Sequence, residues 1–213
     1  MKIFKKRNVN FNAEEINLLV QHGKMIFNLF KSSDVVKIPK ILKFDSKYIY
    51  YEYLNLSCSL HKKLSALKCS KNELVAIGGI LRIMHDNNVA HADFVPHNIY
   101  LEKKIILIDF QPPSGVNITK KVLYSGLETE AAGFIFSLIS NFGAKRSLLN
   151  LFYLRNLIKS FIIGYVNFNP SLSSMLRYSK KVFFNRKLNG FSKKTTILHT
   201  VTVFILANLL IRF

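Results

Sequence analysis

Tryptophan is absent from this chain, and acidic side chains are scarce. The 213 residues hold 31 Lys and Arg against 12 Asp and Glu, which gives a formal net charge of +19. No acidic residue follows Glu130, whereas residues 131–213 hold 12 basic ones. This excess favours an anionic partner, whether a nucleotide, a nucleic acid, an anionic membrane face or a phosphorylated glycan.

Cysteine is also scarce, and its spacing excludes a cysteine-based metal site. Cys58 and Cys69 are the only two cysteines, and no Cys or His pair has the spacing of zinc ligands. We therefore expect two reduced thiols in a cytoplasmic protein. The N-terminal stretch MKIFKKRNVNF lacks the apolar run of a signal peptide.

Long runs without charge are few, and one of them, rich in apolar residues, lies at the C-terminus. Thr195–Ile211, TTILHTVTVFILANLLI, has 17 residues without a formal charge. A spanning helix needs about 20 apolar residues, so this run is at the lower limit. We rank a buried or docked C-terminal helix first, an interfacial helix second and a membrane span third.

The chain is otherwise rich in apolar residues, at 49%, which is enough for a packed core. Apolar periodicity predicts strands at 1–6, 38–44, 48–54, 98–101 and 105–110, and helices at 12–30, 59–67, from 71 to the turn at 86–88, 127–142 and 144–166. Asn12 is the expected N-cap of the first helix. Strands and one helix come first and helices follow, which predicts an α+β fold with two lobes.

Three polar residues in HADFVPHNIYLEKKIILIDF, residues 91–110, carry the clearest chemical signal. Asp93 and Asn98 share one loop, and a tight hairpin would bring Asn98 close to Asp109. A carboxylate and an amide oxygen together suit Mg²⁺, whose octahedron water and phosphate oxygens would complete. Asp93 would then lie within reach of a substrate hydroxyl and could accept its proton.

The same stretch resembles the H-x-D-x-x-x-x-N and D-F signature of the protein-kinase-like fold. It is most similar to the aminoglycoside-phosphotransferase and lipopolysaccharide-core-kinase types, which often read HGDxxxxN. The resemblance implies that Asp93 is the catalytic base, that Asn98 and Asp109 hold Mg²⁺, and that His91 braces the loop. The upstream LRIMHDNNVA, with a Leu and a His shortly before the motif, also resembles these proteins.

The resemblance extends over about residues 1–140 and implies ATP-binding residues. Lys2, in the first strand, would contact the α- and β-phosphates, and Glu15 would be its ion-pair partner, with Glu14 the alternative. The hinge between lobes would be Glu52, Tyr53 and Leu54, whose backbone groups would bind adenine.

The lobes then divide the chain into three parts. Residues 1–54 would form a truncated N-lobe and residues 55–175 a C-lobe with the catalytic loop and the metal-binding hairpin. Residues 176–213 would hold a basic segment and the apolar C-terminal helix.

The chain also departs from the family pattern. The sequence starts at the strand that resembles the lysine strand, without the usual glycine-rich hairpin over the phosphates. Either this start is late, or the protein works without this hairpin, or it is a degenerate kinase. Ala92 stands where relatives have Arg or Gly, and Gln111 follows Phe110 in place of Gly. Ala92, Gln111 and the short, proline-rich QPPSG that follows Phe110 favour a small molecule or a cell-envelope glycan over a protein as the phosphate acceptor. The missing hairpin favours a pseudokinase. We interpret Glu128 and Glu130 as acids that stabilise a helix N-terminus, with bracing of the catalytic loop as the alternative.

A basic stretch, Arg177–Lys194, precedes the apolar tail and mixes seven basic residues with Tyr and Phe. We rank an anionic membrane surface, contacted by residues 177–211 at the inner face of the membrane, above single-stranded nucleic acid. The leading hypothesis is an ATP- and Mg²⁺-dependent phosphotransferase. Its rivals are a catalytically degenerate pseudokinase that serves as a binding module and a basic RNA-binding protein.

Overall fold

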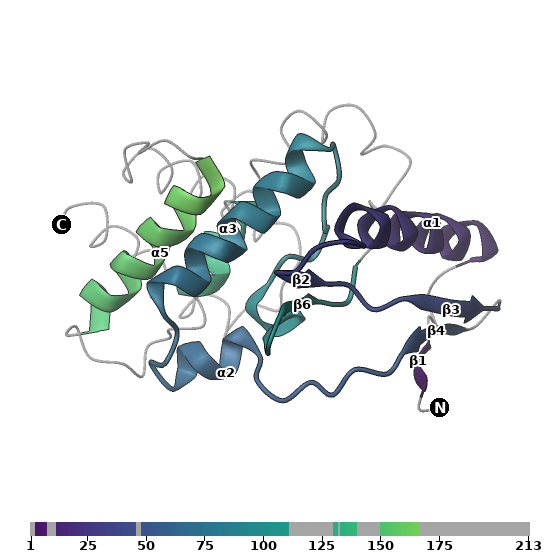
Figure 1. Ribbon diagram of the computed structural model, residues 1–213, viewed down its shortest axis with the longest axis horizontal. Coiled ribbons are helices and arrows are strands. Elements are labelled where there is room, and N and C mark those ends of the chain that lie inside the picture. The colour runs from purple at the N-terminus through teal and green to yellow at the C-terminus, as the bar shows by residue number, and fades with distance from the viewer. Residues whose placement is uncertain are drawn as a thin grey trace, which may run out of the picture.

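The computed structural model describes residues 3–7, 12–45, 48–110, 130–131, 133–139 and 150–166. Strands and helices are both present, which confirms the expected α+β class. Figure 1 shows α1 beside a small sheet at one end of the molecule and α3 packed along α5 at the other. An extended segment after β4 joins the two ends.

The first sheet consists of three antiparallel strands, β1 (Ile3–Arg7), β3 (Ile41–Phe44) and β4 (Tyr48–Glu52). The order is β1-β4-β3, so the strand that leads into the linker lies in the middle. β4 reads YIYYE, and its aromatic and β-branched side chains suit a half-buried strand. All three strands were predicted, with ends that differ by up to three residues.

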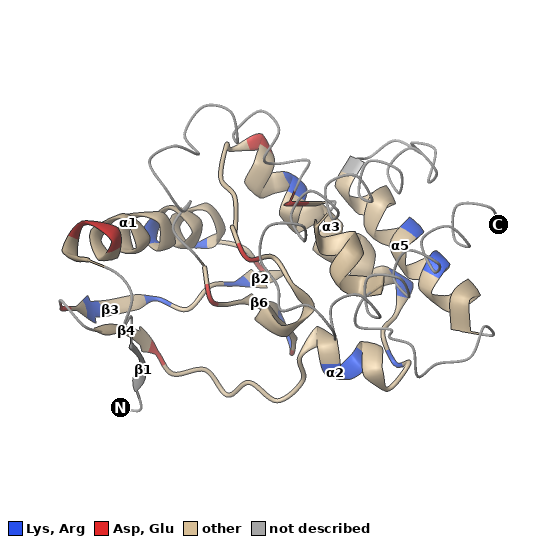
Figure 2. Cartoon of the chain, turned by 180° about the vertical axis from the view of Figure 1, so that it is seen from behind, with Lys and Arg blue, Asp and Glu red and all other residues tan. Residues whose placement is uncertain are grey.

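Helix α1 (Ala13–Phe30) begins where the sequence predicted. The Asn12 side chain accepts from the Glu15 amide at 2.9 Å, and the Glu15 carboxylate accepts from the Asn12 amide at 2.8 Å. This reciprocal pair satisfies two amide groups that the first turn would otherwise leave open. The acidic residues at this end also face the positive end of the helix dipole (Figure 2).

The second sheet holds the predicted hairpin and one strand that was not predicted. β5 (Ile99–Leu101) and β6 (Ile105–Leu107) pair antiparallel, with Ile99 opposite Leu107. β2 (Val36–Lys37) pairs with β6 in parallel and gives the order β2-β6-β5. A strand of two residues is too short to show an apolar periodicity, so the sequence pattern could not reveal it. Its pairing also depends on a partner far along the chain.

The other end of the molecule is helical. α2 (Leu60–Ser65) and α3 (Lys71–Asp86) begin at the N-caps Ser59 and Ser70, residues 130–131 and 133–139 are helical, and α5 (Leu151–Val166) packs along α3. Glycines at the crossing allow the backbones of α3 and α5 to touch. A Cβ atom on Gly78 would lie 2.2 Å from the Phe161 carbonyl oxygen.

The buried side chains form two clusters, and α1 belongs to both. Ile16, Leu19 and Val20 pack with Ile49 in a small cluster against the first sheet. Further along the same helix, residues of the next turns join the large cluster that includes α3, α5 and the hairpin. α1 therefore connects the sheet end of the molecule to the helical end.

Two remaining expectations concern thiols and membranes. Both cysteines are free, as predicted, and Cys69 is buried. Within the described ranges, no helix combines the length and the apolar character that crossing a membrane requires. The basic stretch and the apolar tail, residues 177–211, lie outside the described residues, so their proposed membrane contact stays a prediction.

Candidate active site

Residues 87–98 connect the end of α3 to the start of β5, and we call them the catalytic loop after their predicted role. A side-chain hydrogen bond closes this loop. The Asn98 amide nitrogen donates to the Asp93 carboxylate at 2.8 Å and to the Asp93 carbonyl at 3.0 Å. Asn98 is 8% exposed, and Asp93 is half-buried. The structure thus brings together two of the three residues singled out by the motif.

The hairpin places the third residue next to them. The Ile108 amide donates to the Asn98 carbonyl at 3.0 Å, which continues the β5–β6 pairing by one step. Asp109 follows Ile108 directly and has φ 63, in the left-handed region where a short polar side chain is tolerated. The turn in the backbone after Ile108 therefore comes where the strand pairing ends, beside the catalytic loop.

The donor atoms suit a hard cation. The amide nitrogen of Asn98 donates to Asp93, so the amide oxygen of Asn98 is the atom that could bind a metal. Together with the Asp109 carboxylate this would give two oxygen ligands, the number with which Mg²⁺ is commonly held beside phosphates. The described residues contain no group of three or more His, Cys, Asp and Glu side chains fit for a metal ion. The roles of Asn98 and Asp109 as metal ligands remain predictions.

Glu130 holds the catalytic loop from below. Its carboxylate accepts from the His91 amide at 3.1 Å, from the Ala92 amide at 2.6 Å and from the His85 ring at 2.9 Å. Burial alone would raise the pKa of Glu130, but the His85 hydrogen bond and the nearby His91 outweigh it and lower the pKa. These three hydrogen bonds fit the alternative interpretation, in which Glu130 braces the catalytic loop. The preferred interpretation, an acid at a helix N-terminus, stays a prediction, because the residues before Glu130 lie outside the described residues. Glu128 lies outside the described residues.

Two further residues complete this support and were not predicted. His85, near the end of α3, contacts Glu130 through Nε2, and its Nδ1 lies 2.8 Å from the Tyr165 hydroxyl of α5. The histidine shortly before the motif was the one signal in the sequence. Tyr165 had none, because its contact depends on how α5 crosses α3.

His91 braces the loop through packing. It is fully buried, and its ring lies 4.6 Å from the Phe110 ring and 5.5 Å from the Phe94 ring. Phe94 in turn packs on Phe134 at 4.9 Å. Neither ring nitrogen of His91 has a hydrogen-bond partner of ordinary geometry among the described residues. Burial lowers the pKa of His91 to about 4, so the ring is neutral at physiological pH and supports the loop by its packing against the two phenylalanine rings.

Ala92 occupies a strained position, which supports a stability prediction. Its φ is 66, where a residue with a Cβ atom costs about 1–2 kcal/mol relative to the right-handed region. Ala92→Gly should remove this strain and gain about 0.5–1 kcal/mol of unfolding free energy, after the entropy cost of glycine is subtracted. Urea unfolding measures the change. Ala90→Gly is the matched control, because Ala90 lacks a positive φ and should lose stability; equal losses in both variants would contradict the strain argument.

The expected phosphate-binding pair is only partly visible. Lys2 lies outside the described residues, and Glu15 caps the start of α1 through one carboxylate oxygen. Their ion pair therefore stays a prediction.

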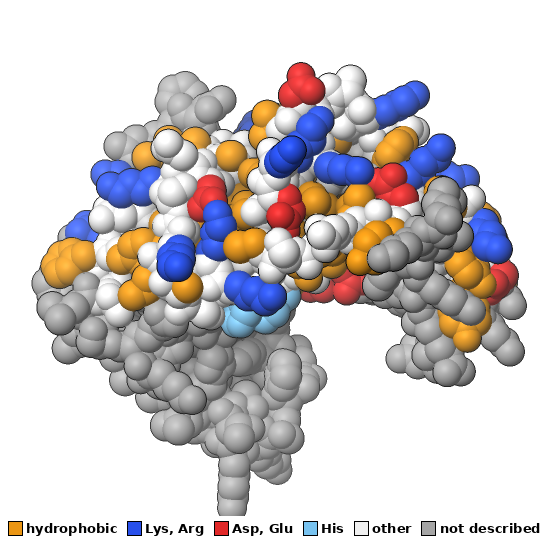
Figure 3. All heavy atoms as spheres, turned by 60° about the horizontal axis from the view of Figure 1, so that its bottom comes forward, with side chains coloured by type: hydrophobic (Ala, Val, Ile, Leu, Met, Phe, Trp, Pro, Cys, Tyr) orange, Lys and Arg blue, Asp and Glu red, His pale blue; other side chains and the backbone are white. Residues whose placement is uncertain are grey.

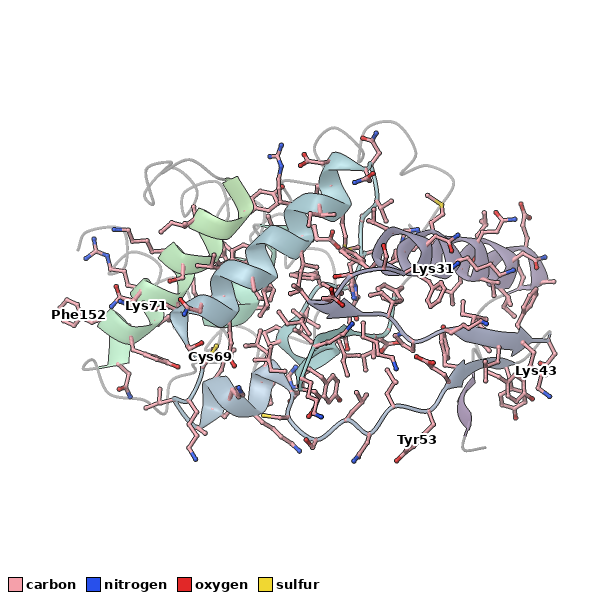
Figure 4. The ribbon with its side chains drawn as sticks, in the orientation of Figure 1. Lys31, Lys43, Tyr53, Cys69, Lys71 and Phe152 are labelled. Carbon is pink, nitrogen blue, oxygen red and sulfur yellow. The ribbon has the colours of Figure 1, made fainter. Side chains whose placement is uncertain are left out.

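The proposed hinge is visible in full. The Glu52 amide donates to the Lys40 carbonyl, and the Glu52 carboxylate pairs with Lys37 at 3.3 Å. Tyr53 projects from the linker with 48% of its surface exposed (Figure 4), and Leu54 is half-buried. Glu52 uses its amide to bond the Lys40 carbonyl, so this amide is not the group that would bind adenine. The adenine contacts of this hinge remain a prediction.

Two comparisons bear on this site. Residues 49–114, which span β4, the catalytic loop and the hairpin, match the model of the lipopolysaccharide kinase (Kdo/WaaP) family. The chain is also 33% identical over 93 residues to a "Putative serine/threonine-protein kinase" of Acanthamoeba polyphaga mimivirus. That match covers 39% of this chain and 32% of the relative, so the chain spans about a third of the relative's length. The resemblance to the protein-kinase-like fold, of the lipopolysaccharide-kinase type, is confirmed.

Proposed function

We propose, from the kinase-family match over residues 49–114 and the geometry of the loop beside it, that the chain is an ATP- and Mg²⁺-dependent phosphotransferase. It would transfer the γ-phosphate of ATP to a hydroxyl of a small molecule or a cell-envelope glycan. The observation that carries the proposal is the hydrogen bond from Asn98 to Asp93, next to the hairpin that ends at Asp109.

Each residue would have a separate task. Asp93, oriented by Asn98, would accept the proton of the acceptor hydroxyl as the oxygen attacks phosphorus. Asn98 and Asp109 would hold Mg²⁺, which would neutralise charge on the phosphates. Glu130 and His91 would keep the loop in place, so that Asp93 faces the acceptor without reorganisation.

The N-terminal residues would bind the nucleotide. Lys2, paired with Glu15, would contact the phosphates, and the linker at Glu52, Tyr53 and Leu54 would offer backbone groups to adenine. The Lys37–Glu52 ion pair supports the start of this linker. Burial raises the pKa of Tyr51, next to it, to about 12, so this ring stays neutral at the edge of the proposed adenine site.

The match to the model of a lipopolysaccharide kinase family supports a cell-envelope glycan as one class of acceptor. The basic stretch and apolar tail, residues 177–211, support work at the cytoplasmic face of an anionic membrane, where each basic residue contributes about 1 kcal/mol of binding. Cosedimentation with anionic but not with neutral vesicles would test this part. In the view of Figure 3, Lys and Arg side chains are dispersed over the described surface, which gives less support to an RNA site.

Nucleotide binding by the full chain tests the proposal. Thermal unfolding with ATP should show stabilisation in Mg²⁺ that is smaller in EDTA, since only the loaded site binds the triphosphate tightly. ADP formation is then measured with aminoglycosides, neutral sugars and acidic sugars as acceptors. Binding without ADP formation for any acceptor would favour the pseudokinase. No binding, together with RNA affinity that falls steeply with salt, would favour the RNA-binding protein.

A further inference from the structure

His22 lies in the middle of α1 and reaches across to the segment that enters the catalytic loop. Its Nε2 lies 2.7 Å from the Ala90 carbonyl oxygen, 68 residues further along the chain. A carbonyl oxygen can only accept, so the Nε2 of His22 carries the proton and donates. The contact joins the helix of the sheet end directly to the residue before His91.

The position of His22 in the helix gives this bond its significance. Leu19 and Val20, just before it, belong to the small cluster on the first sheet. Ile26, one turn after it, belongs to the large cluster with α3 and the hairpin. His22 thus lies where α1 passes from one apolar cluster to the other. At this level the helix packs partly on the first sheet and partly on the large cluster.

The helix cannot easily shift at this level. A Cβ atom on Gly23 would lie 2.9 Å from the Ile41 side chain, so α1 and β3 are in close contact beside His22. Gly23 packs on β3, and His22, about 100° further round the helix, bonds to the loop, so α1 is held in two directions at this level. The two contacts together set the orientation of α1 relative to Ala90.

The His22–Ala90 hydrogen bond also distinguishes between Glu14 and Glu15, the two candidate ion-pair partners of Lys2. Glu15 precedes His22 by seven residues, which places both on one face of the helix, about 10 Å apart along its axis. Glu14 is turned away from that face by most of a right angle. A helix held by His22 towards the loop therefore presents Glu15, not Glu14, on the side of the active site.

We propose that His22 is a positioning residue, which holds α1 against the catalytic loop and so keeps Glu15 and Asp93 in register across the active site. Its action on catalysis rests on the proposed function, whereas its action on the loop does not. The bond acts through Ala90 on the three residues that follow, two of whose amides Glu130 holds from the opposite side. Desolvation lowers the pKa of His22, so the neutral ring makes this bond at physiological pH.

The test compares two substitutions at one position. His22→Leu removes the donor and keeps much of the volume, whereas His22→Gln places an amide N–H near the original Nε2. Gln21→Leu, on the exposed side of α1, is the control for a new leucine in this helix. Hydrogen–deuterium exchange of the amides of 91–93 is measured without nucleotide, and kcat and KM for ATP are measured in the presence of Mg²⁺.

His22→Leu should speed exchange at 91–93 by about fivefold, the equivalent of one hydrogen bond, and lower kcat with KM for ATP nearly unchanged. His22→Gln should recover most of both effects, and Gln21→Leu should behave as the unmodified chain. Exchange that stays slow in His22→Leu, or a His22→Gln variant as impaired as His22→Leu, would overturn the proposal. If the unmodified chain shows no turnover, the proposed function fails, and the exchange rates alone still decide whether His22 holds the loop.

Discussion

Asp93→Asn should lower phosphate transfer by about a thousandfold, within the range that a positioned general base contributes, while ATP and Mg²⁺ still bind. The substitution keeps the size of the side chain and leaves an oxygen that can accept from the Asn98 amide nitrogen. The loop should therefore keep its closed form, and only the capacity to take up a proton is lost. ADP formation and calorimetric ATP affinity, measured on the same preparation, separate the two properties.

Asp109→Asn should impair the binding of ATP, whereas Asp93→Asn impairs only phosphate transfer. The proposed Mg²⁺ site has two protein ligands, so the loss of the charged one should remove the Mg²⁺-dependent part of ATP affinity. Affinity in EDTA should change little, since the proposed adenine contacts lie in the linker at residues 52–54 and not at Asp109. Calorimetry with and without Mg²⁺ measures both quantities.

Asp86→Asn is the matched control for both changes. Asp86 is an exposed aspartate at the end of α3, paired with Arg82 one turn earlier, and it precedes the catalytic loop in sequence. An exposed ion pair of this kind contributes less than about 1 kcal/mol, so transfer and binding should remain as in the unmodified chain. Full activity in the Asp93 variant, or Mg²⁺-dependent affinity in the Asp109 variant, would refute the assigned roles.

The parts of the fold that sequence reasoning found are those specified by neighbouring residues. Asn12 was recognised as an N-cap, and it is spaced from Glu15 so that side chain and backbone satisfy each other within one turn. The helix predicted from residue 71 begins with the same arrangement at Ser70 and Glu73, which was not predicted. The hairpin likewise follows from two short apolar runs and the polar turn between them. These signals are local, so they are legible without knowledge of the rest of the chain.

The features that sequence reasoning missed depend on contacts between residues that are far apart in the sequence. β2 is a strand only because β6, some 70 residues later, lies beside it. Glu130 falls near the predicted start of a helix, where an acid is ordinary, and its three donors come from α3 and the catalytic loop. The His22 contact with Ala90 is of the same kind. Sequence pattern identified the residues expected to do chemistry, and the tertiary structure identified those that hold them.

Glycine at the crossing of α3 and α5 is a further case, because GGILR and IIGYV look like helix segments weakened by glycine. The structure gives the reason for two of these glycines. A Cβ atom on Gly164 would lie 2.0 Å from the Val75 carbonyl oxygen, and one on Gly78 would lie 2.8 Å from the Tyr165 nitrogen. Backbone atoms cannot turn aside as a flexible side chain can, so a methyl group at either position must push the helices apart.

Gly164→Ala should therefore destabilise the protein by about 3 kcal/mol, at the upper end of overpacking costs, although alanine favours a helix over glycine by about 1 kcal/mol. Gly79→Ala, one residue from Gly78, is the matched control, because its Cβ atom would lie 3.8 Å from the nearest carbonyl oxygen, an ordinary contact. There the helix preference should prevail and raise stability. Urea unfolding of both variants tests the opposite signs, and a loss of similar size in each would show that glycine is not required by the crossing.

The crossing also affects the active site. Gly164 precedes Tyr165, whose hydroxyl is hydrogen-bonded to His85 of α3. His85 is in turn hydrogen-bonded to Glu130, which holds the catalytic loop. Helices forced apart at Gly164 would lengthen the Tyr165–His85 contact first, and Glu130 would lose one of its three donors. We therefore expect Gly164→Ala to speed amide exchange at His91 and Ala92 under conditions where the protein remains folded, while Gly79→Ala leaves it unchanged. Slow exchange in a destabilised Gly164→Ala variant would mean that the loop is held by Glu130 independently of how the two helices pack.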